Sequence, residues 1–184
     1  AIAQALALAD AHVTLVTGPV TLPNPHGVHT VHVQTALQMF EAVQAHLPVH
    51  VAVCAAAVAD WRVDTRKDGK FKKQAGGKPP TLSLVENPDI LSMLGHLDVK
   101  ARPQIVVGFA AEVENLVDTA AKKCAAKHAD FILANNVAGG AIFGADTTHV
   151  MAVNAHSLIA DWGPMTKDTC ARMLTETLIK DLRL

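Results

Sequence analysis

Residues 49–62, VHVAVCAAAVADWR, decide the fold expected for this 184-residue chain. The first half, VHVAV, is an apolar run typical of a strand buried within a sheet. The second half changes to the small side chains of residues 54–57 and then reaches the charged Asp60. Small side chains at the carboxyl end of such a strand, where α/β sheets bind ligands, leave space against the backbone. Taken alone, the stretch favours a tightly packed junction with Asp60 as a turn residue.

Composition indicates one globular domain, residues 1–184. Half of the residues are hydrophobic and 18% are charged, and this length suffices for one hydrophobic core. The formal net charge of −1 provides no positive field for nucleic acid or an anionic membrane. The three cysteines show neither metal-binding nor disulfide spacing, so a reducing, cytoplasmic location is expected.

Strand and helix patterns alternate along the chain, which predicts an α/β fold with a doubly wound, mainly parallel sheet and helices on both faces. Apolar or alternating runs predict strands at 13–17, 28–33, 49–54, 81–85, 104–110, 130–134 and, as an edge strand, 149–154. Helical spacing predicts helices at 1–9, 35–47, about 112–128 and 167–184, with one more beginning at Asn87-Pro88-Asp89. Thr35 and Asn87 are the expected N-caps of their helices.

A polar segment at about 61–80, rich in lysine and glycine, interrupts this alternation. Twenty residues without regular structure inside a domain are usually functional or disordered, so we interpret the segment as a mobile flap. The chain also begins inside a helix, AIAQALALA, which predicts that an upstream segment is missing.

Two groups of lysines are candidate phosphate ligands: Lys70, Lys72 and Lys73 in the flap, and the pair Lys123 and Lys127, four residues apart on one helix face. Solvated lysines are the commoner alternative for such groups. Phe109, at a predicted strand end, is either a surface for stacking a base or part of the core.

Other common sites find no support in the sequence. A P-loop and a G-x-G-x-x-G fingerprint are absent, the ten histidines are dispersed, and no spacing indicates a catalytic nucleophile. Cys54, in an apolar run, is interpreted as packing.

Six motifs occur in a specific order: AAAVADWR (55–62), KFKKQ (70–74), ENPDIL (86–91), VGFAAE (107–112), KK-x3-K (122–127) and ILANNV (132–137). As a set they resemble the phosphopantothenoylcysteine synthetase family of the bacterial type, the C-terminal half of a bifunctional coenzyme A biosynthesis flavoprotein. The resemblance extends over nearly the whole chain.

This resemblance implies a Rossmann-like ligase that activates the carboxylate of 4′-phosphopantothenate with CTP. Pyrophosphate leaves, an acyl-cytidylate forms, and the amino group of cysteine displaces CMP. The implied nucleotide contacts are Cys54, Ala55, Ala56, Asp60, Lys70, Pro88, Asp89, Ile90, Leu91, Phe109, Lys123 and Lys127. Lys70 is also the implied catalytic residue, neutralising charge on the phosphates.

Further expectations follow from the same resemblance. Magnesium is expected on the triphosphate and waters rather than in a protein cage, and its protein ligands are unknown. A homodimer is expected, FMN only if a decarboxylase domain is fused upstream, and the family's catalytic asparagine in the missing segment. A dinucleotide-binding oxidoreductase domain and a non-catalytic scaffold are the alternatives; only the ligase explains KFKKQ, NPDIL and GFAAE together.

Overall fold

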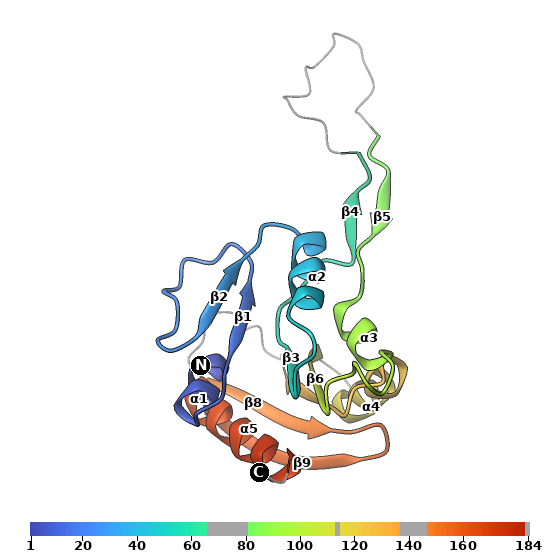
Figure 1. Ribbon diagram of the computed structural model, residues 1–184. Helices are drawn as coiled ribbons and strands as arrows, with labels where there is room; N and C mark the ends of the chain where they lie inside the picture. The colour runs from blue at the N-terminus through green and yellow to red at the C-terminus, as the bar shows by residue number, and fades with distance from the viewer. Residues whose placement is uncertain (66–80, 113–114, 137–146, 183–184) are drawn as a thin grey trace.

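The computed structural model describes residues 1–65, 81–112, 115–136 and 147–182 (Figure 1). Its helices are α1 (Ile2–Leu8), α2 (Ala36–Ala45), α3 (Ile90–Gly95), α4 (Leu116–Lys127) and α5 (Lys167–Leu182). Its strands are β1 (Thr14–Thr17), β2 (His29–His32), β3 (Val51–Cys54), β4 (Trp61–Val63), β5 (Leu84–Glu86), β6 (Ile105–Glu112), β7 (Phe131–Asn136), β8 (Thr147–Val153) and β9 (Leu158–Thr166). The predicted α/β class is confirmed.

The main sheet has the strand order β3-β6-β7-β8-β9. Strands β3, β6 and β7 are parallel, whereas β8 and β9 continue the sheet in antiparallel fashion. Strands β1 and β2 form a separate parallel pair, and β4 and β5 form an antiparallel ribbon that projects from the body (Figure 1). Within the main sheet, the parallel strands β3, β6 and β7 are mostly apolar runs, as strands covered on both faces require.

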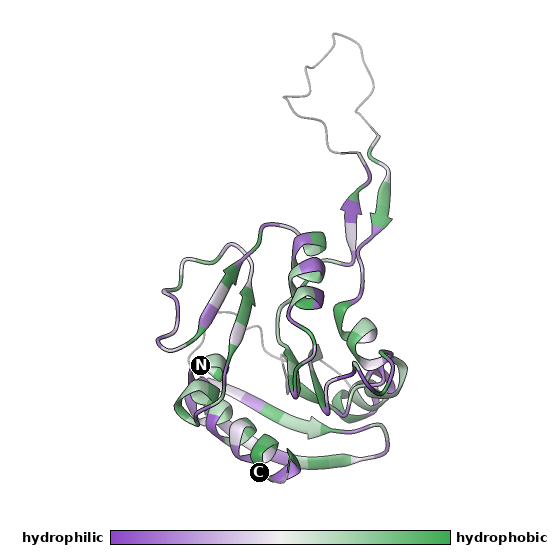
Figure 2. Cartoon of the chain, viewed as in Figure 1, coloured by the Kyte–Doolittle hydropathy of each residue, from purple (hydrophilic) through white to green (hydrophobic). Residues whose placement is uncertain are grey.

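Side chains alternate between the two faces of the sheet and build two cores. Val106, Ala110 and Ile132 face α3 and α4, where they pack with residues such as Leu94 and Cys124. The intervening residues of β6 and β7 pack with Leu174 and other apolar residues of α5. Apolar residues accordingly colour the central strands in Figure 2. The prediction of helices on both faces is confirmed.

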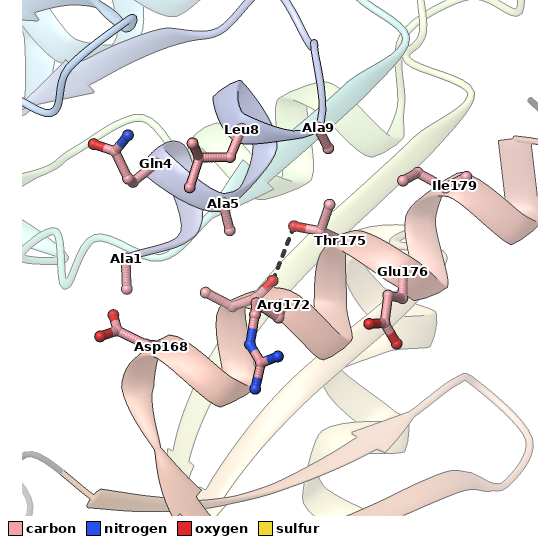
Figure 3. Close-up of a pocket in the computed structure, with 11 residues that line it drawn as sticks. Ala1, Gln4, Ala5, Leu8, Ala9, Asp168, Arg172, Thr175, Glu176 and Ile179 are labelled. Carbon is pink, nitrogen blue, oxygen red and sulfur yellow. Dashed lines mark hydrogen bonds between the residues drawn. The ribbon is translucent and has the colours of Figure 1, made fainter.

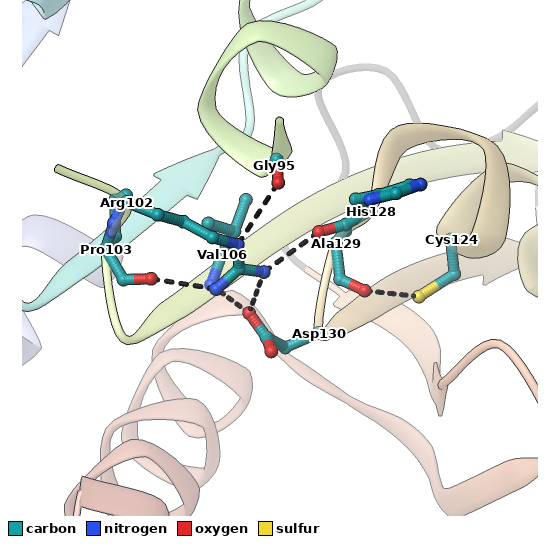
Figure 4. A network of polar contacts seen from close by, with 8 residues as sticks. All are labelled: Gly95, Arg102, Pro103, Val106, Cys124, His128, Ala129 and Asp130. Atoms are coloured by element: carbon teal, nitrogen blue, oxygen red, sulfur yellow. Dashed lines mark hydrogen bonds and ion pairs between the residues drawn. The ribbon is translucent and has the colours of Figure 1, made fainter. Parts of the chain in front are cut away.

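Arg102 joins four elements at the amino ends of β6 and β7 (Figure 4). Its guanidinium donates to the carbonyls of Gly95, Pro103 and His128 and pairs with Asp130 at 2.9 Å. The same Asp130 oxygen accepts the Val106 N–H at 2.6 Å. This network fixes the carboxyl-terminal ends of α3 and α4 to the sheet, at the amino ends of its parallel strands.

The prediction for the end of the sheet was wrong. Strand β8 is not an edge strand, because β9 pairs with it through Met151↔Asp161 and neighbouring pairs. Asp161, Gly163 and Pro164 interrupt the period-two pattern of β9, and all of its residues are exposed or half-buried, so the sequence carries little strand signal there.

Two local predictions need correction and one is confirmed. The expected flap begins with β4, because Trp61 pairs with Glu86; residues 66–80 lie outside the described part. Asp89, not Asn87, is the N-cap of α3, since its carboxylate accepts the Ser92 N–H. Thr35 does cap α2, in a reciprocal capping box with Gln38.

Candidate functional site

The carboxyl end of β3 lies beside the middle of β6, where Cys54 is in register with Gly108. A Cβ added to Gly108 would lie 2.5 Å from Ile132 Cδ1 and 2.6 Å from Leu91 Cδ2. Glycine at this position therefore admits the first turn of α3 onto the sheet. Cys54, Ile90 and Leu91 pack into the core on this face, which brings three predicted contacts together.

The loop after β3 exposes the small and acidic residues of the prediction. Ala55, Ala56 and Asp60 are exposed, so this surface is open to a ligand. The end of the loop is fixed by Asn87, whose backbone N–H donates to the Asp60 carbonyl and whose side-chain amide donates to the Ala59 carbonyl, each at 2.8 Å. Half-buried Pro88 follows directly and connects this contact to α3.

Asp89 and Lys127 form an ion pair between α3 and α4, with 2.5 Å between Oδ2 and Nζ. Partial burial acts to raise the pKa of Asp89, but hydrogen bonds from Lys127 and the Ser92 N–H, with the charges of Lys127 and Lys123, outweigh it and lower the pKa below its ordinary value. The carboxylate is thus ionised at neutral pH and balances the charge of Lys127.

Lys123 lies on the same face of α4 and donates to the carbonyl of Phe109 at 3.1 Å. The shared face predicted from the spacing of Lys123 and Lys127 is confirmed. The ring of Phe109 packs against the other core, with α5, on the opposite face of the sheet. The structure therefore brings the Phe109 backbone, but not its ring, to the lysines.

The Cys54 thiol is protonated at neutral pH, because burial and then the nearby Asp89 carboxylate raise its pKa to about 11. A thiolate nucleophile is therefore not available at this position near pH 7. Cys54 contributes packing, as the sequence indicated.

Not every predicted residue can be placed. Lys70, Lys72 and Lys73 lie outside the described residues, and so does residue 137 of the last motif. The sequence analysis did not assign Arg62 and Asn87 to the site, although Asn87 bonds the Ala59 carbonyl and Arg62 bonds Asn87. Arg62 lies in the motif AAAVADWR and Asn87 in ENPDIL, and these motifs are the signal that could have indicated them.

A pocket of about 470 Å³ lies away from this site, between α1 and α5 (Figure 3). Gln4, Leu8 and Arg172 are among its lining residues, and none of the predicted nucleotide contacts lines it. Within the described ranges, no group of three His, Cys, Asp or Glu side chains is arranged to hold a metal ion, and no helix is long and apolar enough to cross a membrane.

Sequence comparison relates this chain to one family. The pattern of the DNA/pantothenate metabolism flavoprotein C-terminal domain family matches residues 1–182. The coenzyme A biosynthesis bifunctional protein CoaBC of Haemophilus influenzae is 42% identical over 147 residues, which are 79% of this chain and 36% of that protein. CoaBC of Bacillus subtilis is 45% identical over 153 residues, 82% of this chain and 36% of that protein. The chain thus spans about a third of these relatives.

Solved structures agree with this relationship. The crystal structure of the C-terminal domain of a CoaBC protein matches with a TM-score of 0.80 and 31% identity, covering 99% of this chain and 80% of that one. The DNA/pantothenate metabolism flavoprotein from Streptococcus pneumoniae matches with a TM-score of 0.73 and covers 99% of this chain and 85% of that one. At 20% identity, the second match concerns the fold alone.

Proposed function

Because the chain belongs to the DNA/pantothenate metabolism flavoprotein C-terminal domain family, we propose that it acts in coenzyme A biosynthesis as a CTP-dependent phosphopantothenate–cysteine ligase. The observation that carries the proposal is the grouping of three motifs at one edge of the sheet. Three segments that are far apart in the sequence meet there: the small-residue loop (residues 55–60), the turn at Asp89, and the face of α4 that carries Lys123 and Lys127.

The proposed reaction has two steps. A carboxylate oxygen of 4′-phosphopantothenate attacks the α-phosphorus of CTP, the bond from that phosphorus to the bridging oxygen breaks, and pyrophosphate leaves. The amine of cysteine then attacks the acyl carbon of the acyl-cytidylate and loses a proton, and the bond to CMP breaks as the amide forms.

The site can stabilise the negative charge of this chemistry. Among the described residues, Lys123 donates one hydrogen bond, to the Phe109 carbonyl, so two of its three N–H donors remain for a phosphate oxygen. Lys127 is balanced by Asp89, so we propose that it orients the start of α3 and becomes a phosphate ligand only if the nucleotide displaces that carboxylate. Exposed Ala55 and Ala56 leave the backbone open to the nucleotide.

Lys70 completes the proposal as the residue that neutralises charge developing on the phosphates. Its assignment rests on the KFKKQ motif. Magnesium is proposed to reach the site on the triphosphate; since the described residues offer no group of ligands for it, no step is assigned to a protein-held metal.

The test is calorimetric titration of the protein with CTP, ATP and NAD, each with magnesium. CTP should bind well ahead of ATP and NAD. Equal affinity for ATP would contradict the assignment of CTP, and tight binding of NAD would favour the oxidoreductase alternative. Pyrophosphate release with 4′-phosphopantothenate and CTP, followed by CMP release on addition of cysteine, then tests the two steps.

A further inference from the structure

Asn87 connects the small-residue loop, residues 55–60, to the start of α3. We propose that Asn87 is a positioning residue for the nucleotide site, holding this loop in place through two hydrogen bonds. The inference rests on the proposed function, because the loop matters as a surface for the nucleotide.

The contacts of Asn87 are arranged as a clamp on two successive carbonyls. Its backbone N–H donates to Asp60 O and its side-chain Nδ2 donates to Ala59 O, each at 2.8 Å. Within the described residues, these are the hydrogen bonds that join the backbone of the loop to the rest of the chain. The loop has no helix or strand of its own, and these two bonds hold its second end, at residues 59 and 60.

Asparagine meets both chemical needs at this position. The amide nitrogen donates to the Ala59 carbonyl, while the amide oxygen accepts from the Arg62 guanidinium at 3.3 Å. Arg62 also donates to the Glu86 carbonyl, so it ties the side chain of Asn87 to the end of the β4–β5 ribbon. An aspartate would keep the acceptor but lose the donor, and a carboxylate would then face the Ala59 carbonyl.

A short link carries this position to the charged part of the site. Pro88 has a fixed φ and no N–H, and the next residue, Asp89, caps α3 and pairs with Lys127. Movement of Asn87 would therefore alter the distance between the loop and the lysine face of α4. A residue that only ended the β4–β5 ribbon would not couple the loop to the lysines of α4, so this coupling makes Asn87 a positioning residue.

The experiment compares Asn87→Ala and Asn87→Asp with a control, Asn154→Ala. Asn154 also uses its side chain to bond backbone, accepting the His156 and Ser157 N–H groups, but it lies in the β8–β9 turn. Three quantities are measured for each variant: CTP affinity by calorimetry, the unfolding midpoint, and hydrogen exchange of the amides in residues 55–60 without nucleotide.

Both Asn87 variants should bind CTP on the order of five- to tenfold more weakly, the effect of one lost neutral hydrogen bond. Amide exchange in the loop should accelerate in both variants. Asn87→Asp should lower the unfolding midpoint less than Asn87→Ala does, because Arg62 still has an acceptor. Asn154→Ala should leave CTP affinity and loop exchange unchanged.

The proposal is overturned if CTP affinity and loop exchange are unchanged in both variants, or if Asn87→Ala lowers the unfolding midpoint while the folded protein binds CTP normally. Weakening in Asn87→Asp alone would assign the effect to the added charge and would also overturn it. If the unsubstituted protein binds no CTP, the proposed function fails, whereas loop exchange still decides whether Asn87 holds the loop.

Discussion

At the scale of single residues, the Asp89 carboxylate receives hydrogen bonds from two directions. One oxygen accepts the Ser92 N–H within α3 and the other accepts the ammonium of Lys127 from α4. These contacts favour the ionised form more than partial burial disfavours it, so the pKa lies below the ordinary value. A lowered pKa in the folded protein contributes stability above the pKa of the unfolded chain, about 3.9, and this contribution is lost as the pH falls through the folded value.

Replacing Lys127 with Gln should therefore raise the pKa of Asp89, since the largest opposing contribution is removed. Carboxyl titration by NMR measures the change directly. The acid limb of the stability curve should move with it, so that the variant loses this stabilisation at a higher pH. Lys122→Gln, an exposed neighbour on α4, is the matched control and should leave the titration of Asp89 unchanged. An unshifted pKa in Lys127→Gln would contradict the ion pair.

Residue-scale prediction succeeded where local periodicity decides and stopped where tertiary contact decides. The spacing of Lys123 and Lys127 fixed their common helix face, but their partners, Phe109 and Asp89, depend on packing between elements. The placement of the Phe109 ring follows from strand alternation: Gly108 faces α3, so the next side chain faces α5. The position of the ring was therefore predictable from the sequence. It was left open because Phe109 was placed at the end of the strand, whereas β6 continues to Glu112.

At the scale of elements, the contact between α3 and β6 depends on Gly108. Gly108→Ala should destabilise the fold by about 1–3 kcal/mol, because the added Cβ would overlap Leu91 and Ile132 and the packed core cannot expand freely. Urea unfolding measures the loss. Gly18→Ala is the matched control, since nothing lies within 4 Å of the added Cβ. Equal stability of the two variants would show that α3 moves at no cost.

The Arg102 network is a second contact between elements, at the far edge of the sheet. Arg102→Lys should cost about 2–3 kcal/mol, because one ammonium cannot replace the forked guanidinium that serves three carbonyls and Asp130. Denaturant unfolding tests the loss. Unchanged stability in Arg102→Lys would contradict this role of the network.

Element boundaries were predicted where the local chemistry is unambiguous. Thr35 is the N-cap of α2, as expected, and forms a capping box with Gln38. In α3 the N-cap is Asp89 instead of the expected Asn87, because the side chain of Asn87 bonds the Ala59 carbonyl. Strand β9 was not predicted, because its sequence has no alternating pattern. It is a strand because it pairs with β8, and register shifts interrupt that pairing.

For the whole molecule, stability should differ between the centre and the edge of the main sheet. Strand β7 pairs on both sides, and residues 131–134 are buried. Among the described residues, β3 pairs with β6 alone, and all four of its residues are only half-buried. The proposed site therefore sits at the end of the less protected strand.

Hydrogen exchange followed by mass spectrometry tests this gradient and its link to function. Amides of β3 should exchange at least about tenfold faster than those of β7, because edge strands open locally at lower free energy than core strands. CTP with magnesium should slow exchange at residues 54–60 and 87–91, since a ligand that binds only the closed site lowers the population of its open forms. NAD should not do so.

The pocket between α1 and α5 supplies an internal control, because amides around Ala5 and Thr175 should exchange equally with and without CTP. Protection confined to that pocket would move the nucleotide site away from the strand ends, whereas protection at the end of β3 together with the start of α3 would support the proposed site.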